Sequence, residues 1–124
     1  MGLGSDGGLL VPERIPSLER NIRDLSSASY SELAFEIFKL YIDDIAERDL
    51  RQIVDKSYSN FSNSKVTPLV QVGEEYVLEL FHGPTLAFKD IAMQFLGPLF
   101  DHVLATRGEH ICIVGATSGD TGSA

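Results

Sequence analysis

One lysine of this 124-residue chain stands in an unusual setting. Lys89 follows the apolar run Leu86-Ala87-Phe88 and precedes an amphipathic stretch that begins at Asp90. Burial among apolar groups disfavours the charged ammonium, and the positive end of a helix dipole disfavours it further. Both effects favour the neutral amine, which is a nucleophile and a general base. Lys89 is therefore a candidate catalytic lysine. The alternative is a surface lysine whose stem covers apolar groups while Asp90 pairs with its charge.

A glycine-rich segment, GATSGDTG over residues 115–122, follows an apolar run and precedes a helix expected to begin near Thr121. Free backbone N–H groups and the helix dipole favour an anion at such a position. A P-loop is excluded because no lysine follows the glycine. The triplet Asp120-Thr121-Gly122 resembles that of aspartic proteases, but the residues before it are not apolar. An ordinary glycine-rich turn stays open as an alternative.

The N-terminal half of the chain is expected to be mainly helical. Ser29 and Glu32 have the spacing of a capping box, and apolar positions continue that helix toward Ile45. A shorter helix is expected before it, over 18–25, and a longer one after it, over roughly 46–58. These elements predict a small helical N-terminal domain over residues 1–72.

An α/β part is expected over residues 73–124. The runs 66–72 and 76–81 are β-prone and are separated by a turn at Gly73, which predicts a hairpin. A strand to Phe81, a helix from Asp90 to about Ala105 and a strand over 110–114 predict a βαβ unit, with a kink at Pro98. Because the chain ends where the next helix should begin, we expect an incomplete sheet.

Composition excludes several functional classes. The chain is 44% hydrophobic and 23% charged, which is ordinary for a globular domain. Its net charge of -8, without a basic run, argues against binding nucleic acid. The single cysteine, Cys112, forms no internal disulfide and is expected in the core, and no run is apolar enough to span a membrane. The histidines have no metal-ligand spacing, and a cytoplasmic location is expected.

Three segments together resemble one family. LELFHGPTLAFKD over residues 78–90 is similar to the cofactor-lysine signature of threonine synthases, which are pyridoxal-phosphate enzymes of the tryptophan synthase β class. GLGSDGGLLVPE over residues 2–13 resembles the opening of that family, and GATSGDTGSA over residues 115–124 resembles its substrate loop. The resemblance implies a fold type II pyridoxal-phosphate domain and the conversion of O-phospho-L-homoserine and water to L-threonine and phosphate.

The resemblance also implies roles for individual residues. Lys89 matches the lysine that holds the cofactor, with Phe88 and Asp120 beside the cofactor, although related enzymes often carry an asparagine in place of Asp120. The expected substrate contacts are Thr85, Thr117, Ser118, Gly119 and Thr121. His82 is equally compatible with touching substrate or phosphate and with being a packed histidine.

Alternatives to a synthase stay open at this point. A threonine-synthase-like phospho-lyase that releases 2-oxobutyrate carries the same three motifs. A non-catalytic folding or interaction module is a further possibility, with self-association through a surface left open by truncation. In the family, the cradle for the cofactor phosphate lies downstream of Ala124, so the 124 residues alone are expected to be inactive.

Overall fold

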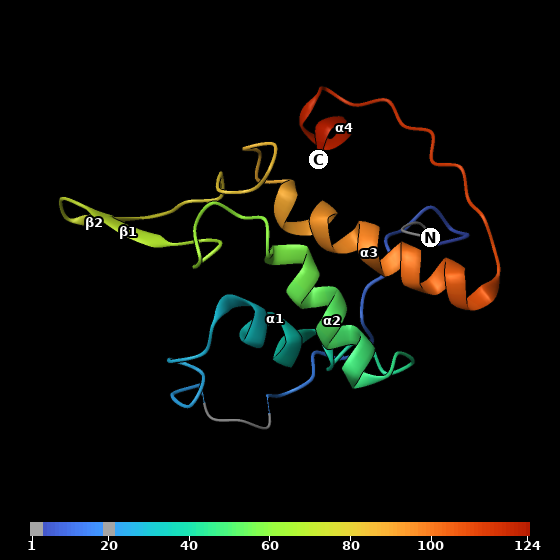
Figure 1. Ribbon diagram of the computed structural model, residues 1–124, viewed down its shortest axis with the longest axis horizontal. Helices are drawn as coiled ribbons and strands as arrows, with labels where there is room; N and C mark the ends of the chain where they lie inside the picture. The colour runs from blue at the N-terminus through green and yellow to red at the C-terminus, as the bar shows by residue number, and fades with distance from the viewer. Residues whose placement is uncertain (1–3, 19–21) are drawn as a thin grey trace.

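The computed structural model describes residues 4–18 and 22–124. It is a mixed chain of helices and one small sheet (Figure 1). Its elements in chain order are α1 (Tyr30–Phe38), α2 (Glu47–Tyr58), β1 (Leu69–Val72), β2 (Glu75–Leu78), α3 (Asp90–Arg107) and α4 (Asp120–Ser123).

The hydrophobic core lies where α1, α2 and the start of α3 meet. Its buried members are Phe35, Leu50, Val54, Tyr58, Phe61 and Val66. The Tyr58 hydroxyl, at the end of α2, donates a hydrogen bond of 3.2 Å to the carbonyl oxygen of Ile91, in the first turn of α3. Phe38 and Phe95 pack with ring centroids 4.3 Å apart. The end of α2 therefore lies against the first turn of α3, so the start of α3 is packed on the core.

Local sequence signals explain where the helices begin and end. The capping box predicted for α1 is confirmed, because Ser29 Oγ accepts from the Glu32 amide and the Glu32 carboxylate accepts from the Ser29 amide. Helix α1 ends at Phe38, earlier than Ile45, and residues 39–41 form turns. The predicted second helix is confirmed as α2. Helix α3 ends at Gly108, whose φ of 64° is a left-handed conformation that favours glycine.

The predicted hairpin is confirmed in a shorter form. Strands β1 and β2 pair antiparallel, with Leu69 opposite Leu78 and Val72 opposite Glu75. All eight strand residues are exposed, and in Figure 1 the hairpin projects away from the helices. The predicted division between residues 72 and 73 falls in the turn of this hairpin.

The predicted βαβ unit is not formed. The helix is confirmed as α3, and Pro98 lies inside it, but residues 110–116 carry no strand. A parallel strand requires a neighbour that shares its backbone hydrogen bonds, and β2 pairs only with β1. Residues 110–114 instead run exposed from α3 back to α4 (Figure 1). Cys112 is accordingly an exposed free cysteine, and its predicted place in the core is wrong.

Two further sequence expectations concern the N-terminal part and membranes. The helix expected over 18–25 falls partly outside the described residues, and residues 22–27 form turns. In the described ranges 4–18 and 22–124, no helix has the length and apolar character needed to cross a membrane.

Candidate functional site

The lysine stands at the last position before α3. Lys89 has helical backbone angles (φ −59°, ψ −26°), and its carbonyl oxygen accepts the first helical hydrogen bond, of 2.9 Å, from the Met93 amide. A tight loop leads into it, closed by a hydrogen bond of 3.2 Å from the Leu86 amide to the Gly83 carbonyl. Leu86 has a φ of 63°, which is uncommon for a residue other than glycine. The tertiary structure therefore imposes the geometry of this loop.

A buried carboxylate closes the loop on itself. Asp90 is completely buried, and both of its oxygens accept hydrogen bonds from Thr85. Oδ2 accepts from the Thr85 amide at 2.9 Å, and Oδ1 accepts from the Thr85 hydroxyl at 2.8 Å. Because a buried carboxylate is costly unless its oxygens are satisfied, this arrangement defines one conformation of residues 85–90. We call this pair of hydrogen bonds the Thr85–Asp90 clasp.

Gly83 completes the packing around the clasp. A Cβ atom at position 83 would lie within 3.0 Å of the Cβ, Cγ and Oδ2 atoms of Asp90, closer than real Cβ atoms approach. Glycine is therefore required at position 83 by this close approach, because any side chain would displace Asp90.

The amine of Lys89 is left without a counter-charge. Lys89 is half-buried, and among the described residues no ion pair includes it. Its Nζ lies 4.7 Å from the centre of the Phe88 ring. Phe88 and Leu86 are 54% and 70% exposed, so these two residues do not form the apolar pocket expected around the amine. The alternative in which Asp90 pairs with Lys89 is wrong, because Asp90 contacts Thr85 instead.

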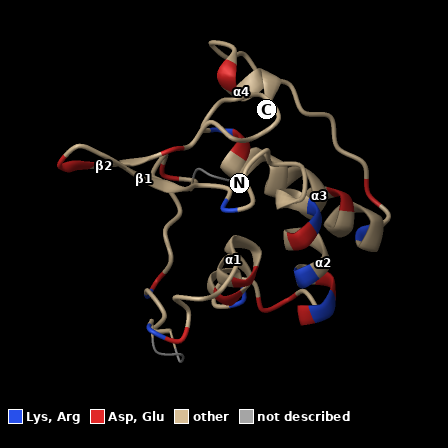
Figure 2. Ribbon diagram, turned by 60° about the vertical axis from the view of Figure 1, so that its left-hand side comes forward, with Lys and Arg blue, Asp and Glu red and all other residues tan. Residues whose placement is uncertain are grey.

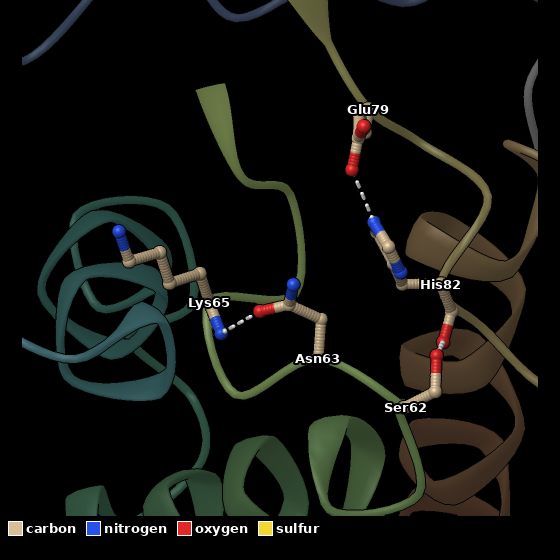
Figure 3. A network of polar contacts seen from close by, with 5 residues as sticks. All are labelled: Ser62, Asn63, Lys65, Glu79 and His82. Atoms are coloured by element: carbon tan, nitrogen blue, oxygen red, sulfur yellow. Dashed lines mark hydrogen bonds and ion pairs between the residues drawn. The ribbon is translucent and has the colours of Figure 1, made fainter. Parts of the chain in front are cut away.

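His82 belongs to a polar network beside this loop. Its Nε2 lies 2.6 Å from Oε2 of Glu79, and both side chains are half-buried. The carbonyl oxygen of His82 accepts from the amide and the hydroxyl of Ser62 at 2.9 and 3.1 Å (Figure 3). These hydrogen bonds attach the segment that precedes the lysine loop to Ser62, shortly after the end of α2.

The glycine-rich loop is held by one of its own threonines. Thr117 Oγ1 accepts hydrogen bonds of 3.1 Å from the amides of Gly119 and Gly122. Gly119 has a φ of 126°, and α4 begins directly after it, which confirms the helix expected near Thr121. Ser118 and Asp120 are exposed, and Thr121 is half-buried. The Thr117 hydroxyl oxygen therefore accepts hydrogen bonds from two amides that could otherwise donate to a bound anion.

The lysine loop and the glycine-rich loop lie at the same end of α3 (Figure 1). Gln94, in the second turn of that helix, donates a hydrogen bond of 3.2 Å from Nε2 to the carbonyl oxygen of Ala124. Figures 1 and 2 view the molecule from directions 60° apart, and in both α4 lies beside the end of α3 that Lys89 opens. Segments 30 residues apart in sequence are thus brought together around one helix end.

Comparison with known proteins identifies the relatives of this chain. Residues 1–58 match a family model described as threonine synthase N terminus. The chain is 53% identical to the threonine synthase of Pseudomonas aeruginosa, over 99% of this chain and 27% of that protein. It is 47% identical to the threonine synthase of Saccharomyces cerevisiae, over 99% of this chain and 27% of that protein. The chain is related to the N-terminal part of threonine synthases.

Solved structures of threonine synthases have the same fold in this region. The crystal structure of a PLP-bound threonine synthase from Brucella melitensis superimposes with a TM-score of 0.89 at 50% identity, covering 98% of this chain and 27% of that one. For the yeast threonine synthase the TM-score is 0.78 at 44% identity, covering 86% of this chain and 23% of that one. The chain spans about a quarter of the length of the relatives it matches.

Sequence reasoning missed the residues that hold the two threonine synthase motifs in place. The sequence predicts Asp90 as the start of a helix and as a possible partner of the lysine, but not as a partner of Thr85, and no pattern points to Gln94, Glu79 or Ser62. Asp90 did carry a signal, because a carboxylate next to an apolar run must find partners when it is buried. Gln94 carried none, because its contact depends on where the chain returns 30 residues later.

Proposed function

We propose that this chain is the N-terminal part of a threonine synthase and that Lys89 is its pyridoxal-phosphate lysine. The observation that carries the proposal is that the Lys89 amine, at the start of α3, has no ion-pair partner within residues 4–18 and 22–124, since Asp90, the nearest carboxylate in sequence, contacts Thr85 instead. A primary amine without an ion-pair partner is the group that an aldehyde cofactor requires. The relationship to a PLP-bound threonine synthase supports the assignment.

The neighbouring residues fit such a cofactor chemically. When bound, pyridoxal phosphate supplies an electron sink for charge that develops on the substrate. Lys89 would hold the cofactor aldehyde and carry protons to and from the substrate carbons. The exposed Phe88 ring would pack beside the cofactor, and Asp120 would lie near the 3′ oxygen attached to its pyridine ring. Beside that oxygen, the Asp120 carboxylate would have to be protonated or accept a hydrogen bond from another group.

The proposed substrate is O-phospho-L-homoserine, which is converted with water to L-threonine and phosphate. The loop residues Thr117, Ser118, Gly119 and Thr121 would bind the substrate carboxylate. Glycine-rich turns that open a helix favour anions through their backbone amides. Binding there would require the Thr117 hydroxyl to release the amides of Gly119 and Gly122. Thr85 is the remaining proposed substrate contact, with His82 as a further candidate.

The wider architecture is part of the same proposal. The complete protein would have a fold type II, tryptophan synthase β-like domain, beginning near residue 73 after a helical domain over 1–72. The exposed apolar residues 110–114 would become a strand of its sheet once neighbouring strands are present. We propose a cytoplasmic protein that acts on a small molecule and binds neither nucleic acid nor membrane. The 124 residues alone would self-associate through the exposed hairpin, which sedimentation over a range of concentrations measures.

A product assay on the intact protein tests the function. With pyridoxal phosphate and O-phospho-L-homoserine, we expect equal amounts of threonine and phosphate. Lys89→Ala lowers the rate by at least about 100-fold, the contribution typical of one acid–base group. Lys56→Ala, on the exposed side of α2, is the matched control and keeps full activity. Release of 2-oxobutyrate without threonine would identify the phospho-lyase instead. Activity of the isolated 124 residues would contradict their proposed dependence on the rest of the enzyme.

A further inference from the structure

The Thr85–Asp90 clasp holds a carboxylate that none of the proposed chemical steps uses. Asp90 is the residue directly after the lysine, and it is one of two buried polar residues in ranges 4–18 and 22–124. Its two oxygens are both satisfied by a single residue five positions earlier in the chain. The same side chain leaves no room for a Cβ atom at position 83, where the chain has glycine. Two other residues of the lysine motif, Gly83 and Thr85, are therefore arranged around Asp90.

We propose that Asp90 is a positioning residue that sets the direction in which the Lys89 side chain leaves α3, an inference that rests on the proposed function of Lys89. Consecutive residues on an α-helix point about 100° apart, because one turn takes 3.6 residues. Lys89 has helical backbone angles, so this relation applies between it and Asp90. While the clasp holds Asp90 toward the loop, Lys89 must point to a different side of the helix start.

The clasp also fixes the role of Thr85. The Thr85 amide and hydroxyl proton are both given to Asp90. A threonine oxygen retains its acceptor lone pairs, so Thr85 can accept a hydrogen bond from a substrate amine while the clasp is closed. Thr85 therefore acts first on Asp90, and it cannot donate to a substrate anion without opening the clasp.

Three substitutions separate positioning from charge. Asp90→Ala removes the clasp, and Thr85→Val removes one of its hydrogen bonds with little change of shape. Asp90→Asn removes the charge but keeps both contacts, because the amide oxygen accepts from the Thr85 amide and the amide NH₂ donates to the hydroxyl oxygen. Positioning requires Asp90→Asn to behave like the wild type and the other two variants to differ from it.

The first measurement is amide hydrogen exchange of the intact protein without cofactor. In Asp90→Ala and Thr85→Val, the Thr85 and Leu86 amides exchange about tenfold faster or more, the factor expected for losing one charge-assisted hydrogen bond. Amides of α2 keep their wild-type rates in each variant that is folded. Unchanged exchange at Thr85 in both variants would overturn the clasp as the element that fixes the loop, whatever the function of Lys89.

The second measurement is pyridoxal-phosphate labelling of the same proteins, trapped with borohydride and mapped by peptide mass. The readout is the labelling rate of Lys89 relative to Lys56 and Lys65. We expect Lys89 to be labelled faster than Lys56 and Lys65 in the wild type and in Asp90→Asn. In Thr85→Val this ratio of labelling rates should fall about tenfold, matching the change in the amide exchange rate. Equal labelling of all lysines in the wild type would refute the proposed function, and with it the link to Lys89. A lead lost in Asp90→Asn with normal exchange would show action through charge and overturn positioning.

Discussion

The substitution Gly83→Ala is the sharpest test of how the lysine loop is packed. The added Cβ would lie within 3.0 Å of the Cβ, Cγ and Oδ2 atoms of Asp90. Gly83 does not have a left-handed φ, so the alanine backbone itself is unstrained and the effect comes from this contact. Asp90 is completely buried and cannot swing into solvent. Relief therefore requires α3 to shift or the Thr85–Asp90 clasp to open.

The expected cost follows from those two routes. Overpacking a buried site costs about 1–3 kcal/mol, and weakening one hydrogen bond to a charged group adds about 1.5 kcal/mol, so we expect a loss of about 2.5–4.5 kcal/mol in the free energy of unfolding. Gly97→Ala is the matched control. Position 97 is exposed inside α3, and no atom lies within 4 Å of a Cβ there. At position 97 the helix propensity of alanine favours the variant by about 1 kcal/mol, but Pro98 disfavours a Cβ on the helical residue before it, so we expect little net change in stability.

Urea unfolding of the 124-residue chain, followed by circular dichroism, measures both variants. At a slope of about 2 kcal/mol per molar urea, Gly83→Ala lowers the midpoint by about 1–2 M. The same chemical change should therefore lower the midpoint at position 83 and leave it nearly unchanged at position 97. A Gly83→Ala protein as stable as the wild type would refute the close packing of Gly83 on Asp90, and with it the account of why the motif requires glycine there.

Two other predictions concern the helical core. Burial, and secondarily the nearby Tyr30, raises the pKa of Tyr58, and burial also raises the pKa of Tyr30. Because the unfolded chain loses these protons first, the two tyrosines contribute a constant amount to stability below pH 10 and less above it. Tyr58→Phe should show a smaller fall in melting temperature between pH 9 and pH 11, whereas Tyr76→Phe on the exposed hairpin should fall as the wild type does. Ser29→Ala removes the α1 cap and should lower stability by about 1 kcal/mol in urea unfolding, whereas Ser29→Asp, which keeps an acceptor, should retain it.

Local signals predicted α2, α3 and the start of α1, but not the end of α1 or the turns over residues 22–27. The capping box at Ser29 and the apolar spacing along α2 and α3 each act within a few residues of the element that they define. The hairpin was predicted for the same reason, because Gly73 permits a tight turn between two β-prone runs. The strand over 110–114 depends on partners elsewhere in a sheet, and its sequence alone could not supply them.

The lysine motif shows where sequence reasoning stops. The pattern singles out Lys89 because a lysine between an apolar run and a helix is chemically unusual, and its role as the cofactor lysine stays a prediction. It assigned the neighbouring Asp90 as a possible counter-charge, since adjacent opposite charges commonly pair. The structure reverses that assignment, because residues adjacent on a helix point about 100° apart and the carboxylate reaches Thr85 instead. Under the proposed function Lys89 needs an uncompensated amine, and the contact of Asp90 with Thr85 gives the carboxylate next to it in sequence a different partner.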